Sequence, residues 1–252
     1  MRNFLGLLMI MTVTVSTASA DFLRAQAGAG LWMPSMTGTA QYKGNLAFDV
    51  EQDTGLDGND GTYIWAYIKH PVPVIPNVRL EHTAYSETST KVLTSPVQFK
   101  NRTFTASTET TLDLTQTDVI LYYNFLDNLV WLTLDVGIDV KMYGGEVAIQ
   151  NSLYNESVEL DAVLPLGYLR VRGELPGTGL AIEADVKGIS AGGASVTDAR
   201  AKLDWTLISA GLALGVEAGY RTYSITLDDV SGVDTDVDLE MSGFFGGINV
   251  KF

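Results

Sequence analysis

Hydrophobic and polar residues alternate along most of the chain, and the stretch "NLVWLTLDVGIDVK" shows this most clearly. A period of two places successive side chains on opposite faces of an extended strand, so the stretch predicts a strand with one apolar and one polar face. The apolar positions are Val130, Leu132, Leu134, Val136, Ile138 and Val140. The positions between them are Trp131, Thr133, Asp135, Gly137, Asp139 and Lys141.

The same alternation recurs in residues 23–33, 180–187, 199–207, 214–221 and 244–252. It is interrupted by stretches rich in glycine, proline, asparagine and aspartate, which favour turns and end strands. The chain is therefore predicted to be all-β, with many strands of similar length joined by polar connections.

The polar faces of these strands carry charges of both signs, with glycine interleaved. Glycine weakens a solvent-facing strand, but it is useful where side chains crowd together inside a narrow closed barrel. We therefore expect the polar faces to line a barrel interior and the apolar faces to contact lipid, where the sheet must close because unpaired backbone groups are costly in hydrocarbon. The charges expected to pair across this interior are Asp118, Asp135, Asp139, Glu183, Asp185 and Glu217 with Arg24, Lys69, Arg79, Lys187, Arg200, Lys202 and Arg221.

The connections between strands are expected to alternate between short turns and longer loops, as in transmembrane barrels. Short connections are expected at "PVPVIPN", "LDN", "ELPGTG" and near Gly211, and longer ones include "GGEVAIQNSLYNES" and "SAGGASVTD". The predicted fold is an antiparallel up-and-down barrel of about ten strands, with both termini on the periplasmic side. Eight strands would result if Gly211 is not a turn, and twelve if the loop over residues 91–107 contains a hairpin. A barrel of this size has an interior that side chains nearly fill.

The first twenty residues have the features of a secretory signal peptide. Arg2 provides a short basic region, residues 4–15 are mostly apolar, and Ala18-Ser19-Ala20 is the small-x-small sequence that precedes cleavage. The apolar run is shorter than the roughly 20 residues that a membrane-spanning helix needs. We expect residues 1–20 to be the signal peptide and residues 21–252 to be a single barrel domain.

Composition narrows the possible functions. The 30 acidic and 16 basic residues give a formal net charge of −14, and a chain this acidic lacks the basic surface that nucleic-acid binding requires. There is no cysteine, which excludes disulfide scaffolds, thiol catalysis and cysteine-ligated zinc.

The last residues, "FFGGINVKF", carry a resemblance to a known group. The pair Gly246-Gly247 shortly before the terminal Phe252 resembles the outer-membrane β-barrel family marked by a Gly-Gly pair before a C-terminal aromatic residue. This resemblance implies a Gram-negative outer-membrane protein whose barrel assembly machinery reads the last strand, with Phe252, Val250 and Ile248 as the signal. The family has no established biochemical activity, so the resemblance implies a location and no reaction.

Aromatic residues near strand ends are expected at the membrane–water interface, where their rings are buried and their polar groups stay hydrated. The residues expected there are Tyr123, Phe125, Tyr143, Tyr168 and Phe252.

No catalytic, cofactor-binding or metal-binding residue is predicted. The only histidines, His70 and His82, map to the periplasmic half, away from the extracellular rim at which barrel enzymes place a catalytic histidine. The glycine-rich acidic stretch "DVEQDTGLDGNDG" has oxygen ligands of the kind that Ca²⁺ binds, but it lacks the EF-hand spacing, so a hydrated loop is favoured.

We therefore expect a monomeric, non-enzymatic outer-membrane barrel with a structural or interaction role and a largely filled polar interior. Its expected partners are outer-membrane lipid, lipopolysaccharide and the assembly machinery. The alternatives are a narrow pore or transporter for small solutes, a barrel enzyme and a soluble secreted β-sandwich.

Overall fold

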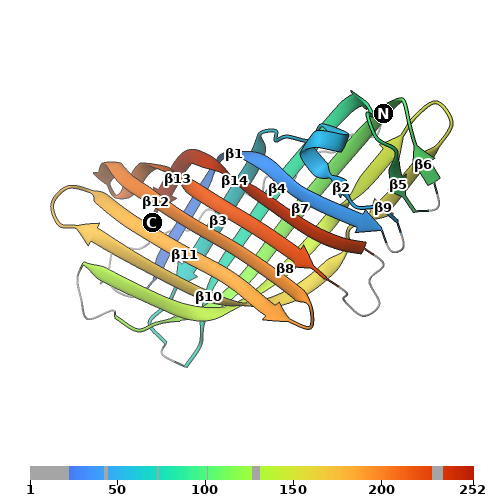
Figure 1. Cartoon of the computed structure of the whole chain (residues 1–252). Helices are drawn as coiled ribbons and strands as arrows, with labels where there is room; N and C mark the ends of the chain where they lie inside the picture. Colours follow the sequence, from blue (N-terminus) through green and yellow to red (C-terminus); the bar gives the residue numbers. More distant parts are fainter. Residues whose placement is uncertain (1–22, 43–44, 73, 101, 127–130, 229–234) are drawn as a thin grey trace, which may run out of the picture.

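Ten long antiparallel strands form one closed barrel in the computed structural model (Figure 1). The structure describes residues 23–42, 45–72, 74–100, 102–126, 131–228 and 235–252, so the predicted signal peptide lies outside the described residues. The barrel strands are β1 (Arg24–Tyr42), β3 (Gly61–Lys69), β4 (Asn77–Val92), β7 (Ser107–Asn124), β8 (Leu132–Gln150), β10 (Ala162–Leu175), β11 (Leu180–Ala191), β12 (Ala194–Ala210), β13 (Leu212–Leu227) and β14 (Thr235–Lys251).

Pairing between the first and last strands closes the barrel. Strands β1 and β14 are antiparallel over 17 residue pairs, from Gln26 opposite Lys251 to Tyr42 opposite Thr235. Every other barrel strand pairs with its neighbours in the chain, with β8 joined directly to β10. The single closed sheet confirms the predicted ten-stranded barrel and excludes the β-sandwich alternative.

Four short elements lie outside the wall. Strand β2 (Phe48–Asp49) pairs with β1, and β9 (Asn155–Glu159) extends the sheet beside β8. Strands β5 (Val97–Phe99) and β6 (Arg102–Phe104) form a separate hairpin between β4 and β7. The loop over residues 91–107 thus contains the hairpin considered above, but this hairpin does not join the barrel, so the strand count stays at ten.

Two connections show how glycine determines the turns. Gly211 has a φ of +82° and separates β12 from β13, which excludes the eight-stranded alternative. Gly192 and Gly193 have φ values of +58° and +83° and join β11 to β12 by a two-residue turn. Two central residues at positive φ suit a tight hairpin, so "SAGGASVTD" is mostly strand and its expected longer loop is wrong.

An apolar belt surrounds the outside of the barrel at the end where the described termini and the shorter turns lie. It is formed by every second residue of the strands, because alternate side chains point outward. Exposed belt residues include Leu31, Met33, Ile64, Leu80, Val136, Ile138, Leu169, Val171, Ile182, Leu203, Trp205, Val216, Phe244 and Ile248. No helix among the described residues is long and apolar enough to cross a membrane.

The polarity of the wall inverts towards the other end of the barrel, and β7 shows the change along one strand. Its outward positions read Val119 and Leu121 within the belt but Thr111 and Asp113 beyond it. Its inward positions include the buried leucines at 112 and 114 beyond the belt, and Asp118 as well as Ile120 and Tyr122 within it. Two sections therefore follow one another along the barrel, one apolar outside and charged inside, the other polar outside and apolar inside.

The apolar interior of the second section closes the mouth of the barrel. The π-helical turn η1 (Val50–Thr54) lies at this end, beside β2 (Figure 1). Its Val50 and the following Leu56 are buried in the largest apolar cluster, together with Met36 and Met241. The loop is held in place by the Met36 N–H, which donates to the carbonyl oxygen of Asp57 at 3.0 Å.

Two of the five aromatic residues expected at the membrane interface instead face the interior. Tyr168 is buried and packs against Tyr122, with ring centroids 6.1 Å apart, and the two residues flank Gly137 from neighbouring strands. Tyr143 accepts a hydrogen bond of 3.1 Å from the Tyr223 hydroxyl across the mouth. Their inward positions follow from strand register, whereas Tyr123, Phe125 and Phe252 are exposed on the outside.

Candidate functional site

The section of the interior enclosed by the belt is lined by charged side chains that project from alternate strand positions. Most of them are buried, and they are connected across the barrel by hydrogen bonds and ion pairs. The cations are Arg79, Lys141, Arg170, Arg172, Lys187, Arg200, Lys202, Arg221 and Lys251. The carboxylates are Glu81, Asp118, Asp135, Asp139, Glu183, Asp185, Asp198, Asp204 and Glu217. The two lists are equal in number, so the acidic excess of the chain lies elsewhere.

Asp198 on β12 is the anion shared by the most cations near the mouth. Its carboxylate accepts two hydrogen bonds from Arg221, both of 2.9 Å, and one of 3.0 Å from Lys141. Lys187 lies 3.3 Å away. Asp118 on β7 bridges the same two lysines, at 2.7 Å from Lys141 and 2.8 Å from Lys187. The two carboxylates and the two lysines therefore each have more than one opposite neighbour, which offsets part of their desolvation cost.

Glu81 on β4 continues the network across the barrel. It accepts from Lys187 at 2.7 Å, from Arg200 at 2.6 Å and from Arg79 at 2.5 Å. Arg200 also binds Asp185 on the neighbouring strand β11 at 2.8 Å. Glu81 thus connects β4 with β11 and β12, which are not neighbours of β4 in the sheet.

A second group of ion pairs lies closer to the short-turn end. Glu183 accepts from Arg170 at 3.2 Å and from Arg172 at 3.1 Å, and Lys202 lies 3.5 Å from it. Arg172 also binds Asp204 at 2.9 Å. These contacts join β10, β11 and β12 from the inside, in addition to the backbone ladder.

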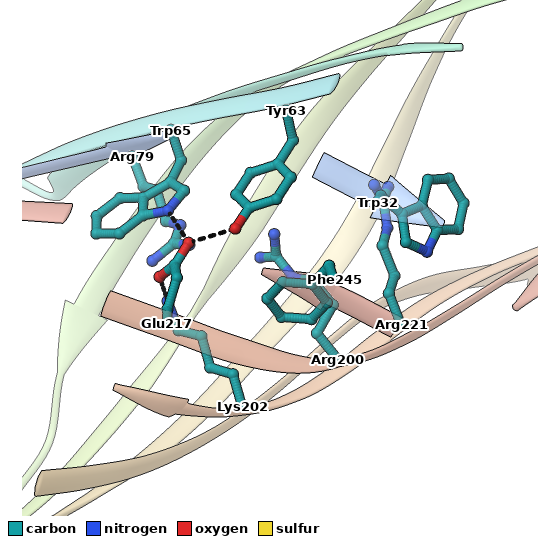
Figure 2. A pocket seen from close by; sticks show the side chains of 9 residues that line it. All are labelled: Trp32, Tyr63, Trp65, Arg79, Arg200, Lys202, Glu217, Arg221 and Phe245. Atoms are coloured by element: carbon teal, nitrogen blue, oxygen red, sulfur yellow. Dashed lines mark hydrogen bonds and ion pairs between the residues drawn. The ribbon is translucent and has the colours of Figure 1, made fainter. Parts of the chain in front are cut away.

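Glu217 on β13 forms the centre of an aromatic pocket (Figure 2). Its carboxylate accepts from the Tyr63 hydroxyl, from the Trp65 indole N–H and from Lys202, each at 2.8 Å. Lys202 also lies over the Trp65 ring, with its Nζ 4.6 Å from the ring centroid, and Arg79 lies at 4.9 Å. Cations over an indole face add attraction to the ion pairs.

The cavity beside Glu217 is small. Its volume of about 20 Å³ leaves room for about one water molecule, and its wall includes Trp32, Phe245 and Arg221 (Figure 2). The neighbouring interior side chains are packed against one another, with Lys141, Lys187 and Asp198 fully buried. The side chains around Glu217 therefore leave little free space.

Inward glycines make room for the large rings. A Cβ atom on Gly28 would lie 2.6 Å from the Trp65 ring, and one on Gly247 would lie 2.6 Å from the Tyr63 hydroxyl. Separations this short are not tolerated, so both positions exclude larger residues. Gly246 points outward, and a Cβ atom there would meet its nearest atom, the carbonyl oxygen of Glu217, only at 3.6 Å. Only the second glycine of the C-terminal pair is required by this packing.

Some buried polar atoms have no hydrogen-bond partner among the described residues. Both carboxylate oxygens of Asp139 are in this group, and this side chain lies between Ile120 and Leu166 on the neighbouring strands. The Trp32 indole nitrogen and the Tyr168 hydroxyl are also without a partner. Asp139 points inward as predicted, but the expected ion pair is wrong, because apolar side chains flank it on both strands.

Most of the other predicted interior charges meet as expected. Asp118, Asp135, Glu183, Asp185 and Glu217 each lie within ion-pair distance of a lysine or arginine. Arg24 is exposed at the barrel end, and Lys69, opposite it on β3, is half-buried there. Interior charges that the sequence analysis did not include among the expected ion pairs are Glu81, Lys141, Arg170, Arg172, Asp198, Asp204 and Lys251, although the alternation of their strands indicates an inward position for each of them.

Neither histidine reaches the interior network. The His70 Nε2 atom lies 3.1 Å from the carbonyl oxygen of Pro76 in the turn between β3 and β4. His82 occupies an outward position of β4, and its Nδ1 atom is 2.8 Å from the Thr117 hydroxyl. Among the described residues, no serine or carboxylate is hydrogen-bonded to either ring.

The acidic stretch over residues 49–60 uses its side chains to hold its own backbone. Asp49 caps η1 by accepting from the Gln52 N–H at 2.7 Å, and Asp53 accepts from the Asp49 N–H at 2.8 Å. Glu87 on β4 accepts from the Asp57 N–H at 3.1 Å. No cluster of three or more metal-ligating side chains occurs among the described residues. The part of the other acidic loop over residues 229–234 lies outside the described residues.

Comparison with known proteins identifies similar folds but no activity for this chain. No family model matches the chain, and no curated protein matches it. Among solved structures, the outer-membrane protease OmpT from Escherichia coli is similar over 94% of this chain and 99% of that chain, with a TM-score of 0.50 and 11% sequence identity. The translocator domain of the autotransporter NalP from Neisseria meningitidis is similar over 94% of this chain and 90% of that chain, with a TM-score of 0.45 and 13% sequence identity. The structural neighbours are outer-membrane β-barrels, and the likeness extends to the fold alone.

Proposed function

We propose that this chain is a barrel protein of the bacterial outer membrane, which spans the membrane through its apolar belt and has a structural or interaction role rather than a transport or enzymatic one. The observation that carries the proposal is the wall itself, which within the belt is apolar outside and charged inside. In water, this arrangement would expose the apolar side chains and bury the charges, which is the reverse of what a soluble protein gains from folding. In lipid, both faces are satisfied.

Membrane insertion is tested by extraction and by gel mobility. The mature chain should remain with the membrane fraction after a carbonate wash and should shift on a gel only when boiled. A chain that was released by carbonate, or that stayed folded and monomeric in detergent-free buffer, would contradict the proposal.

The proposed orientation places both termini and the short turns in the periplasm. The polar section of the wall and the long connections would then face outward, towards lipopolysaccharide. A protease added to intact cells should cut the connection over residues 93–106 and leave the turn at residues 176–179 intact. Cleavage with the opposite preference would invert the orientation.

The filled interior argues against a pore. Purified protein inserted in planar bilayers should show no conductance steps, because ion pairs and aromatic rings occupy the described interior. The double variant Trp65→Ala/Arg79→Ala removes two large side chains from the cavity wall and serves as the comparison, with folding checked by the boiling-dependent gel shift. Regular conductance steps from the unmodified protein would favour the narrow pore or transporter instead.

The proposed assembly signal lies at the seam where the barrel closes. The Phe252 N–H donates to the carbonyl oxygen of Ala25 at 2.9 Å, and the ring is exposed on the outside. Phe252→Ala should lower the yield of assembled barrel in cells if the assembly machinery reads this residue. Phe244→Ala is the matched control, because it removes an equally exposed aromatic ring from the same strand. Equal losses for both variants would count against a terminal signal.

The proposal assigns no catalytic residue. OmpT is named a protease, but His70 and His82 here contact a turn carbonyl and a threonine on the outer face. Replacing both histidines by alanine should leave every growth or envelope phenotype of the protein unchanged. Loss of a phenotype in this variant, with normal assembly, would favour the enzyme alternative.

The barrel is proposed to act as a monomer, because its sheet closes upon itself without a second chain. Analytical ultracentrifugation in detergent should give the mass of one chain, and a mass of two or three chains would contradict this expectation.

A further inference from the structure

Asp139 on β8 is a buried carboxylate to which no described residue donates a hydrogen bond. The residue is 0% exposed, and both of its carboxylate oxygens are without a partner. The other eight carboxylates of the interior network each lie within ion-pair distance of a lysine or an arginine. Asp139 is therefore the exception in a network whose charges are otherwise paired.

The side chains beside Asp139 on the two adjoining strands offer it no donor. Ile120 on β7 and Leu166 on β10 lie directly opposite Asp139, and both are buried. The preceding inward position of β8 is Gly137, which has no side chain. An ionised carboxylate in such surroundings loses its hydration without gaining hydrogen bonds. This loss is costly enough that a buried carboxyl group without a partner takes up a proton instead.

The two lysines near this position are already engaged by other carboxylates. The Nζ atom of Lys187 on β11 lies 2.7 Å from Glu81 and 2.8 Å from Asp118. Asp198 on β12 is its third partner, at 3.3 Å. Lys141, two residues beyond Asp139 on β8, lies 2.7 Å from Asp118 and 3.0 Å from Asp198. Since an ammonium group has three N–H donors, Lys187 has none left for a further carboxylate.

The charges around this position also do not attract a further anion. The charged groups that act on Asp139 are two carboxylates and two lysines, namely Asp118, Glu81, Lys141 and Lys187. Asp118 lies two residues before Ile120 on the inward face of β7, so it is the diagonal neighbour of Asp139 across the ladder. From β10, the titratable residue at the next inward position is Tyr168, an uncharged phenol. A carboxylate on the neighbouring strand disfavours a second negative charge beside it.

We propose that Asp139 is a proton-binding site of the barrel, whose carboxyl group keeps its proton at neutral pH while the other carboxylates of the interior network are ionised. The neutral acid needs no counter-ion and is compatible with the apolar side chains of Ile120 and Leu166. Release of the proton would place an unpaired charge between these two residues, so alkaline conditions would weaken the barrel. The inference goes beyond the proposed function, because the burial of Asp139 does not depend on how the barrel is inserted.

The first test is the infrared spectrum of the full mature chain, folded in a detergent without ester groups. A protonated carboxyl group has a carbonyl stretching band that is separate from the bands of carboxylates. We expect this band at neutral pH in the unmodified barrel and its loss in Asp139→Asn, which resembles the neutral acid in size. Asp135→Asn is the matched control and should keep the band, because Asp135 is a buried carboxylate of the same strand that lies 2.5 Å from Arg170.

The second test is the pH dependence of unfolding in urea. An aspartate in an unfolded chain releases its proton near about pH 4, so between about pH 5 and 7 the unfolded chain holds one proton fewer at this position than the folded barrel. The contribution of this proton to stability is therefore present at low pH and is lost as the pH rises. The unfolding equilibrium constant of the unmodified chain, divided by that of Asp139→Asn, should rise about tenfold per pH unit in this range.

Three results would overturn the proposal. The first is the absence of the band from the unmodified barrel at neutral pH, which requires no variant to fold. The second is a band that persists in Asp139→Asn, because the proton would then be held by another group. The third is a ratio of unfolding constants that stays the same between about pH 5 and 7, because Asp139 would then be ionised in both states. Asp139→Ser, another neutral residue, replaces Asp139→Asn if that variant does not show the boiling-dependent shift of a folded barrel.

Discussion

Replacing Asp198 by asparagine should destabilise the barrel strongly. The substitution keeps the size of the side chain but removes the charge that Arg221, Lys141 and Lys187 share, at 2.9, 3.0 and 3.3 Å. Asp198 is fully buried, so no water is available to replace it. Three cations would then have only Asp118 and Glu81 as nearby anions.

The magnitude follows from the burial of these groups. Removing one partner of a buried ion pair leaves an uncompensated charge and typically costs about 3–5 kcal/mol. No cavity contribution is expected, because asparagine fills the same space as aspartate. We therefore expect Asp198→Asn to lower the free energy of unfolding by about 3–5 kcal/mol, within the range known for broken buried pairs.

The assay is urea unfolding of the barrel in lipid vesicles, followed by tryptophan fluorescence. The control is Glu156→Gln, which removes a carboxylate from the exposed pair with Arg102, where the nitrogen–oxygen distance is 3.4 Å and the side chains are 27% and 50% exposed. Exposed pairs contribute about 0–1 kcal/mol, so this variant should unfold almost as the unmodified protein does.

Equal destabilisation by the two variants would refute the reasoning, because it would mean that the interior pairs are as hydrated as those at the surface. The same conclusion would follow if Asp198→Asn cost less than about 1 kcal/mol, the upper range for exposed pairs.

Two further predictions concern the wall. Gly247→Leu should abolish folding into the heat-modifiable form, because its Cβ would lie 2.6 Å from the Tyr63 hydroxyl, whereas Gly246→Ala should fold normally; equal yields from refolding into detergent would refute this difference. Ile182→Lys, in the middle of the outward belt, should lower the free energy of unfolding in vesicles by about 2–4 kcal/mol, whereas Thr90→Lys on the polar section should change it little, and similar values for the two would show that the belt does not contact lipid.

The barrel could be predicted from sequence because its information is local. An alternation of period two indicates which side chains share a face of the strand, and it can be recognised without any information on contacts with other strands. Residues 132–141 and 199–207 therefore lie as predicted, with Ile138 and Leu203 outside and Lys141 and Lys202 inside. Turn glycines such as Gly211 interrupt the alternation, and these interruptions determine the number of strands.

The partners of the interior charges could not be predicted in the same way. Alternation places Asp139 inside, but only the register with two neighbouring strands shows that Ile120 and Leu166 flank it. The same holds for Tyr168, whose position near a strand end suggested the membrane interface. Register across a closed sheet depends on all ten strands together, and a single strand does not contain it.

The inversion of polarity along β7 was also missed. Burial alternates from Thr110 to Tyr123, but residues 115–118 are all polar and residues 119–123 are all apolar or aromatic, so the sequence of this strand does not show which face is apolar on either side of Gln116. The prediction of a long loop at Gly192-Gly193 was wrong for a simpler reason. Two glycines at positive φ suit a two-residue turn, although a glycine-rich stretch is also typical of a longer loop.

The inversion along the wall has a consequence for the depth of the barrel in the proposed membrane. Sinking by one pair of residues would bring Thr117 and then Thr115 into hydrocarbon, and rising would expose Val119 and then Leu121 to water. Both shifts are unfavourable, so the strands themselves fix the vertical position. A bilayer thicker than the belt would have to thin around the protein, and hydrophobic mismatch of this kind sorts proteins among membranes. The hydrophobic height of the barrel would thus stay constant, and the thickness of the surrounding bilayer would adapt to it.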